Sequence, residues 1–109
     1  MTRLWVDDQR DAPDDTWVVA KTYADAVRIL GDSPMDRVSL DHDLAAYEEE
    51  SGLDIAVWMA ENLTDWPRVI AIHTANLIGG EEMYAVLRKA APAKTHVFID
   101  DRFQGEPTF

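Results

Sequence analysis

Five short runs of apolar residues constrain the fold of this chain more than any other feature. Each run is continuous rather than alternating with polar residues, which is typical of strands whose two faces are both buried. We predict β-strands at residues 4–6, 17–19, 38–40, 69–72 and 97–99. Strands of this kind form parallel sheets that helices cover.

Between the strands, three segments carry apolar residues at helical spacing. Thr22 precedes the first segment with Asp25 three positions later, and Ser51 precedes the second with Asp54, so both starts have the pattern of a capping box. The glycine pair at 79–80 opens the third segment. Alternating strands and helices predict an α/β, doubly wound sheet with right-handed crossovers.

The connection between the first two strands departs from this pattern. Residues 9–16 contain Pro13 and four acidic or amide side chains, with no apolar period. We therefore expect a shortened first crossover without a full helix. The chain has 109 residues, the length of one domain, and we predict a single domain over 1–109.

Composition limits the ligands and the location. The formal net charge of −11 repels a phosphate backbone, so we expect no extended binding to duplex nucleic acid, but a small phosphorylated ligand or an RNA terminus stays possible. Cysteine is absent, so oxygen or imidazole would have to hold any metal. No apolar run approaches the roughly 18 residues of a membrane span, and we expect a cytoplasmic protein, with its oligomeric state open.

Ionisable side chains follow four of the five predicted strands. The carboxyl ends of parallel strands share one edge of the sheet, where ligands of such sheets bind. Crowded carboxylates repel one another unless a cation, a raised pKa or a basic neighbour relieves the repulsion. Oxygen-rich clusters suit magnesium or manganese. The residues at this edge are Asp7, Asp8, Asp41, His42, Asp43, His73, Asp100 and Asp101.

The histidines, Arg10 and Asn76 have roles that such a site would need. An imidazole at His42 or His73 can protonate a leaving oxygen, activate water or bind metal, whereas His96 falls at the opposite end of its strand and is interpreted as structural. Arg10 can clamp a phosphate or pair with its acidic neighbours. Asn76 can hold a phosphate oxygen, orient a histidine or shape a turn.

The acidic pair at 7–8, Asp41 and the Thr-Ala pair at 74–75 resemble the pattern of the response-regulator receiver fold. Two features depart from it: an acidic pair at 100–101 stands where receivers carry a lysine, and a histidine, His42, flanks the position of the acceptor aspartate. These departures argue against phosphoacceptor signalling.

A closer resemblance is to the cyclic-phosphate processing receiver domain family. The chain has Asp-Asp-Gln-Arg-Asp-Ala-Pro at 7–13, Ser-Leu-Asp-His-Asp-Leu at 39–44, Ser-Gly at 51–52 and His-Thr-Ala-Asn at 73–76. These segments are similar to the motifs of the family over nearly the whole chain. The resemblance implies a five-stranded parallel sheet in the order 2-1-3-4-5 and phosphoesterase activity on a cyclic phosphate, such as the 2′,3′-cyclic end of an RNA or a cyclic nucleotide.

With this resemblance, the edge residues suggest a division of roles. We expect a divalent metal, Mg²⁺ or Mn²⁺, to polarise a phosphoryl oxygen while a histidine handles the proton. The predicted metal ligands are Asp7, Asp8 and Asp41, the predicted catalytic residues are His42, His73 and Asp43, and the predicted substrate-binding residues are Arg10, Thr74 and Asn76. Two alternatives stay open: a binding module that sequesters a cyclic nucleotide or phosphorylated ligand with the same residues, and a degenerate receiver that acts by protein contact.

Overall fold

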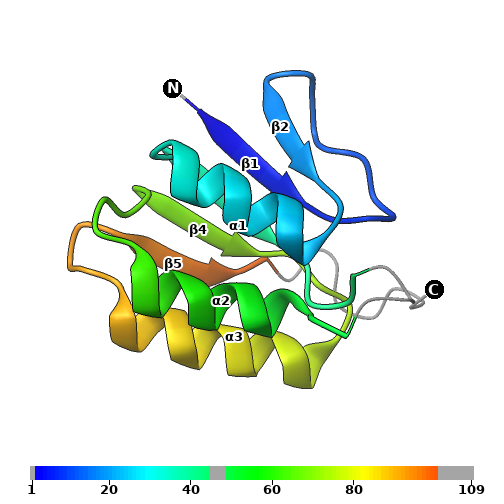
Figure 1. The fold of residues 1–109 in the computed structure, drawn as a ribbon. Coiled ribbons are helices and arrows are strands. Elements are labelled where there is room, and N and C mark those ends of the chain that lie inside the picture. The colour runs from blue at the N-terminus through cyan, green and yellow to red at the C-terminus, as the bar shows by residue number, and fades with distance from the viewer. Residues whose placement is uncertain (1, 45–48, 101–109) are drawn as a thin grey trace.

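The computed structural model describes residues 2–44 and 49–100, and its centre is a five-stranded sheet (Figure 1). All neighbouring strands are parallel, and their order is β2-β1-β3-β4-β5. The predicted α/β fold, strand order and parallel pairing are therefore confirmed. The strands are β1 (Arg3–Val6), β2 (Trp17–Ala20), β3 (Arg37–Leu40), β4 (Val69–Ile72) and β5 (His96–Ile99).

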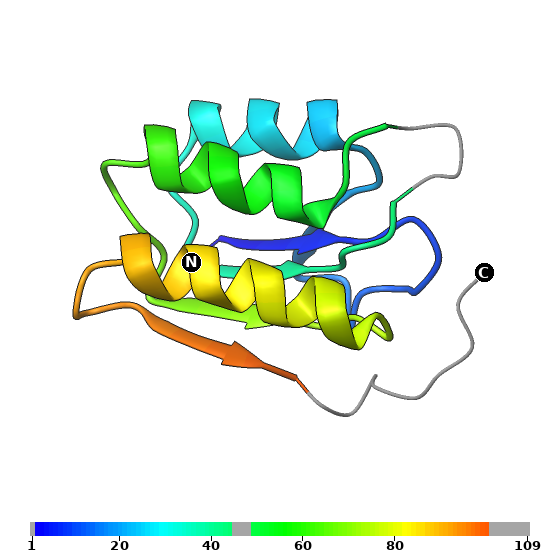
Figure 2. The ribbon, with the colours of Figure 1, turned by 90° about the horizontal axis from the view of Figure 1, so that it is seen from below.

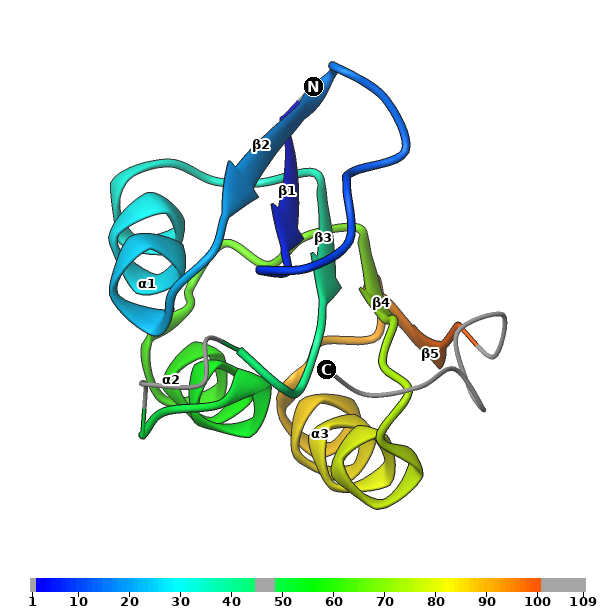
Figure 3. The ribbon, with the colours of Figure 1, turned by 90° about the vertical axis from the view of Figure 1, so that its right-hand side faces the viewer.

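The three helices lie on one face of this sheet (Figures 2 and 3). They are α1 (Tyr23–Asp32), α2 (Gly52–Asn62) and α3 (Leu77–Ala90). Each helix connects strands that follow one another in the same direction across the sheet, so right-handed crossovers place all three on the same side. The connection from β1 to β2 runs in the opposite direction and passes over the other face without a helix, as the sequence predicts.

Side-chain alternation along the strands separates two environments. Leu4, Val6, Leu40 and Ile72 lie on the face that carries the helices and join one hydrophobic core there. The opposite face of β1 carries Trp5, whose indole N–H donates to the carbonyl of Arg10 in the helix-free crossover at 2.9 Å. The expectation that helices cover the sheet thus holds for one face, while the crossover covers Trp5 on the other.

Helix starts follow their capping residues. Ser51 caps α2 with the complete predicted box, because its backbone N–H donates to Asp54 Oδ2 at 2.7 Å. The helix α3 begins at Leu77, before the predicted glycine pair, since the side-chain oxygen of Asn76 accepts the N–H of Gly79 at 2.9 Å. No described helix has both the length and the apolar character needed to cross a membrane.

Candidate functional site

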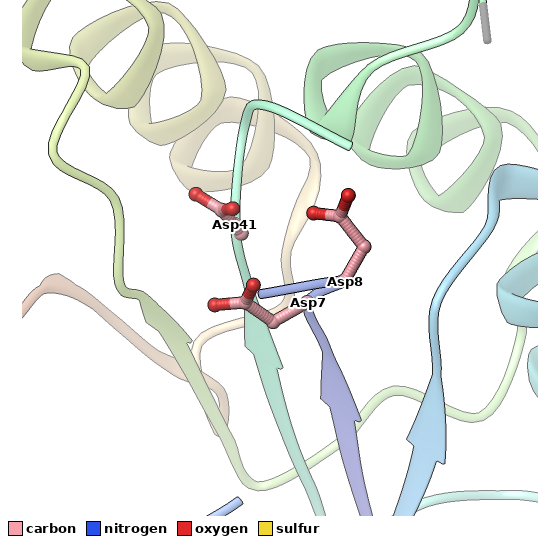
Figure 4. Close-up of side chains that lie close together, drawn as sticks. All are labelled: Asp7, Asp8 and Asp41. Atoms are coloured by element: carbon pink, nitrogen blue, oxygen red, sulfur yellow. The ribbon is translucent and has the colours of Figure 1, made fainter. Parts of the chain in front are cut away.

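Three carboxylates gather at the carboxyl ends of β1 and β3 (Figure 4). Asp7 and Asp8 follow β1, and Asp41 follows β3, which is the neighbour of β1 in the sheet. One oxygen from each carboxylate can be chosen so that all three lie within 4.8 Å of one another. Sheet pairing therefore brings together the three residues that were predicted as metal ligands.

Asp7 is held by hydrogen bonds on both of its oxygens. Oδ1 accepts the backbone N–H groups of Gln9 at 2.8 Å and Arg10 at 3.1 Å. Oδ2 lies 3.0 Å from His73 Nε2 and 3.3 Å from Arg10 Nη1. Burial favours the neutral acid, but the hydrogen bonds from His73 and the two backbone amides outweigh it and lower the pKa of Asp7. Asp7 is therefore ionised at neutral pH.

Asp41 has the opposite tendency. Its burial and the negative charge of Asp7 raise its pKa from 3.8 to about 7, against the hydrogen bond of Thr74 and the charge of Arg10. Its Oδ1 also accepts the backbone N–H of His42 at 2.8 Å. Asp7 is thus fully ionised, whereas ionisation of Asp41 beside it is unfavourable. A bound cation would offset this concentration of negative charge.

Asp8 supplies the atom that best fits a cation. Its Oδ1 is buried and has no hydrogen-bond partner in the part of the chain that the structure describes. Arg10 provides some positive charge, with Nη1 at 3.3 Å from Asp7 Oδ2 and 3.7 Å from Asp41 Oδ2. An orphaned oxygen beside two further carboxylates is an all-oxygen donor set, which suits a hard divalent cation such as Mg²⁺ or Mn²⁺.

His42, Asp43 and Asn76 form a second group beside these carboxylates. Asp43 Oδ1 lies 2.8 Å from His42 Nδ1 and 3.4 Å from Asn76 Nδ2. An ionised carboxylate only accepts, so it places the proton of a neutral His42 on Nδ1 and leaves the lone pair on Nε2. The imidazole packs directly on helix α3, because a Cβ added at Gly79 would lie only 2.5 Å from the ring.

A pocket opens next to the two groups. The residues that line it are Asp8, Gln9, Arg10, Asp41, Asp43, Leu44 and Ala75. Arg10 therefore faces the pocket, as its predicted role requires. Thr74 is buried, forms a side-chain hydrogen bond with Asp41 and accepts the backbone N–H of Asn76 at 3.1 Å. The side-chain oxygen of Asn76 caps the start of α3. Both side chains support the walls of the site, and their predicted contact with substrate stays a prediction.

His73 lies behind Asp7 rather than in the pocket. Its side chain is 0% exposed, its two ring nitrogens lie against Ser39 and Asp7, and burial lowers its pKa. The structure brings it to the acidic cluster but leaves no ring atom open to a substrate. Asp100 follows β5 and lies outside the group of three clustered carboxylates, and Asp101 lies outside the described residues.

Three residues that shape the site stand in the quoted sequence segments, but no site role was predicted for them. Ser39 contacts His73, and Gly52 and Gly79 allow two helices to approach Asp41 and His42 closely. A polar residue inside the apolar run 38–40 was a signal for Ser39. The glycines were noted in a motif and at a helix start, but their close approach to the site depends on which backbone segments meet in the folded chain.

The raised pKa of Asp41 predicts a stability that falls with pH. Between about pH 4 and pH 7 the folded state binds more protons than the unfolded state, so the free energy of unfolding decreases as pH rises through this window. Without divalent cations, Asp41→Asn should melt at a higher temperature than the wild type at pH 8 and at a similar temperature at pH 4. Thermal unfolding in EDTA at the two pH values measures this, with exposed Asp15→Asn as control. Parallel curves for wild type and Asp41→Asn would show that Asp41 ionises normally.

Comparison with known proteins agrees with the geometry of the site. The family model described as the cyclic-phosphate processing receiver domain matches residues 2–89, which include every strand except β5 and all the clustered carboxylates. No curated protein matches the chain. Because the match extends over most of the chain, it agrees with the resemblance seen in the motifs. The chain belongs to the cyclic-phosphate processing receiver domain family.

Proposed function

We propose that this protein hydrolyses a cyclic phosphodiester, such as the 2′,3′-cyclic end of an RNA or a cyclic nucleotide. The observation that carries the proposal is the orphaned oxygen of Asp8 in a cluster with Asp7 and Asp41, next to a pocket that Arg10 lines. Such a cluster favours a cation, and a cation beside a guanidinium favours a phosphate.

The three carboxylates would hold a divalent cation, which supplies a Lewis acid that polarises a phosphoryl oxygen. Arg10 then binds a nonbridging oxygen through its guanidinium, since its side chain is partly exposed and lies in the pocket wall. Arg10 also neutralises charge around Asp7 and Asp41, and it therefore connects the anion-binding part of the pocket with the acidic cluster.

His42 is the group that we assign to proton transfer. In the reaction a water oxygen bonds to phosphorus, one ring P–O bond breaks, and a phosphomonoester with a free hydroxyl group is formed. Nε2 of His42 accepts the proton of water or returns a proton to the departing oxygen, while Asp43 orients the ring through Nδ1. His73 is fully buried, so proton transfer here is left to His42 and water.

The fold and charge also bear on the partner. A net charge of −11 opposes long contacts with a nucleic acid backbone, so we propose a small phosphorylated molecule or a single RNA terminus as the ligand, met in the cytoplasm. The same pocket would also suit a module that sequesters a cyclic phosphate without turnover. Turnover is the property that separates the two functions.

A substrate screen tests the proposal. The wild type is incubated with 2′,3′-cyclic and 3′,5′-cyclic mononucleotides, each with Mg²⁺, Mn²⁺ or EDTA, and products are separated by chromatography. We expect a phosphomonoester from at least one class, formed only with metal. Saturable binding of a cyclic phosphate with no product would identify a sequestering module, and labelling of Asp41 by acetyl phosphate would identify a receiver.

A further inference from the structure

A buried group of three residues, His73, Ser39 and Trp5, lies behind the acidic cluster and takes no direct part in the proposed reaction. We propose that this positioning group holds Asp7 in the orientation that a cation ligand needs. The inference rests on the proposed function, in which Asp7 is a ligand of a bound cation. It gives His73 a role that acts through another residue.

The contact between His73 and Asp7 joins strands that are not neighbours. His73 follows β4, Asp7 follows β1, and β3 lies between these strands in the sheet. The imidazole crosses over β3 and brings Nε2 to 3.0 Å from Asp7 Oδ2. Because both side chains are 0% exposed, no water competes for this hydrogen bond.

Ser39 fixes the proton of the imidazole on the nitrogen that Asp7 needs. Asp7 is an acceptor, so Nε2 of His73 must carry the hydrogen, and Nδ1 of the neutral ring then accepts. The hydroxyl of Ser39 lies 2.6 Å from Nδ1 and supplies the matching donor. Ser39 is also small enough to lie beneath a ring that passes over β3. A buried serine in the middle of an apolar strand thus has a specific partner.

Trp5 fixes the plane of the imidazole. The two rings are stacked with centroids 3.8 Å apart and planes at 8°. The indole N–H donates to the carbonyl of Arg10, so the same residue that supports His73 also anchors the crossover that carries Asp7, Asp8 and Arg10. One face of the His73 ring stacks on Trp5 and both ring nitrogens have hydrogen-bond partners, so the ring has little freedom to move. Its Nε2–H therefore holds Asp7 Oδ2 in one orientation.

Fixed donors behind a metal-binding side chain are known to matter for affinity. Removing such a partner costs roughly 10-fold to 100-fold in metal affinity. A positioning role predicts that the donor at Nε2 is needed and that the titration of the ring is not. An acid–base role predicts the reverse, so the two roles can be separated by substitution.

The test is the affinity for Mn²⁺, measured by calorimetry, with turnover as a separate readout. His73→Ala should weaken Mn²⁺ binding by roughly 10-fold to 100-fold, and Ser39→Ala should weaken it less. His73→Gln should retain most of the affinity, because the glutamine amide offers a donor near the position of Nε2 without a titrating group. His96→Ala, an exposed histidine at the other end of the sheet, and Thr95→Val, which removes a buried hydroxyl there, should leave the affinity unchanged.

The outcomes separate the inference from the proposed function. No Mn²⁺ binding by the wild type would overturn the cation site, and the inference with it. Wild-type affinity in both His73→Ala and Ser39→Ala would overturn the inference alone. Loss of turnover in His73→Gln with unchanged affinity would also overturn it, in favour of an acid–base role. If His73→Ala does not fold, Ser39→Ala and His73→Gln still decide between these results.

Discussion

Gly52→Ala should unfold the protein at a much lower temperature than the wild type. A Cβ at this position would lie 1.9 Å from the backbone oxygen of Asp41 and 2.9 Å from the Cα of His42. These are backbone atoms, so the segment cannot yield as a flexible side chain would. The N–H of Gly52 also donates to the carbonyl of His42 at 2.8 Å, which ties the start of α2 to the site.

Relieving this overlap requires α2 and the segment after β3 to separate. Overpacking of this kind costs about 3 kcal/mol or more, which lowers the melting temperature by roughly 10–20 °C in a domain of this size. Gly31→Ala is the matched control, because its Cβ would meet Trp58 at an ordinary 3.8 Å. Gly31 lies in the last turn of α1, where this change should have little effect on stability or stabilise slightly. Similar melting temperatures for Gly52→Ala and the wild type would contradict the close approach of α2 to Asp41.

His42→Ala should reduce turnover of a cyclic phosphate by roughly 100-fold to 10,000-fold without a comparable loss of stability. The side chain of His42 is 18% exposed and its Nδ1 lies 2.8 Å from Asp43 Oδ1, so the ring can exchange protons with solvent beside the pocket that Asp43 lines. Its removal leaves Asp7, Asp8 and Asp41 in place. Steady-state kinetics together with Mn²⁺ affinity should therefore separate lost proton transfer from lost cation binding.

Gly79→Ala gives an independent check on His42. The added Cβ would lie 2.5 Å to 2.8 Å from three ring atoms and would displace the imidazole without removing it. We expect turnover to fall, while Gly31→Ala again serves as control. If His42→Ala and Gly79→Ala both turn over substrate at near wild-type rates, His42 is not the acid or base of the reaction.

The sheet was predictable because burial leaves a clear pattern in sequence. A continuous apolar run indicates that both faces of a strand are covered, which fails for the edge strand β2, where Val18 and Val19 are exposed, and it does not report what covers the other strands. Helices pack on the face of Leu4 and Val6, whereas Trp5 on the other face is covered by the crossover and by His73. The sequence pattern therefore predicted where the strands lie. It could not predict whether a helix or a stacked histidine ring covers a given face of the sheet.

The same limit applies to the histidines. Both follow a strand closely, and this alone predicted that both reach the acidic edge. Side chains alternate along a strand, so His73, two residues after Ala71, continues the face of the sheet that Trp5 and Ser39 share and becomes buried there. His42 lies beyond the end of β3 and remains near the pocket. The short distance from the strand end predicted that both histidines lie at the acidic edge. The face of the sheet on which each side chain falls decided that His73 is buried and that His42 is partly exposed.

The central claim, that Asp7, Asp8 and Asp41 hold a cation which supports hydrolysis, is tested most directly by the metal dependence of turnover. Phosphorus NMR would follow a 2′,3′-cyclic mononucleotide with the wild type, Asp8→Asn and Asp15→Asn, each in Mn²⁺ and in EDTA. Asp8→Asn removes the charge of the orphaned oxygen, whereas Asp15 is an exposed carboxylate in the crossover. We predict a phosphomonoester signal for the wild type and Asp15→Asn in Mn²⁺ alone, and none for Asp8→Asn. Equal product formation by all three proteins, or by the wild type in EDTA, would contradict the claim.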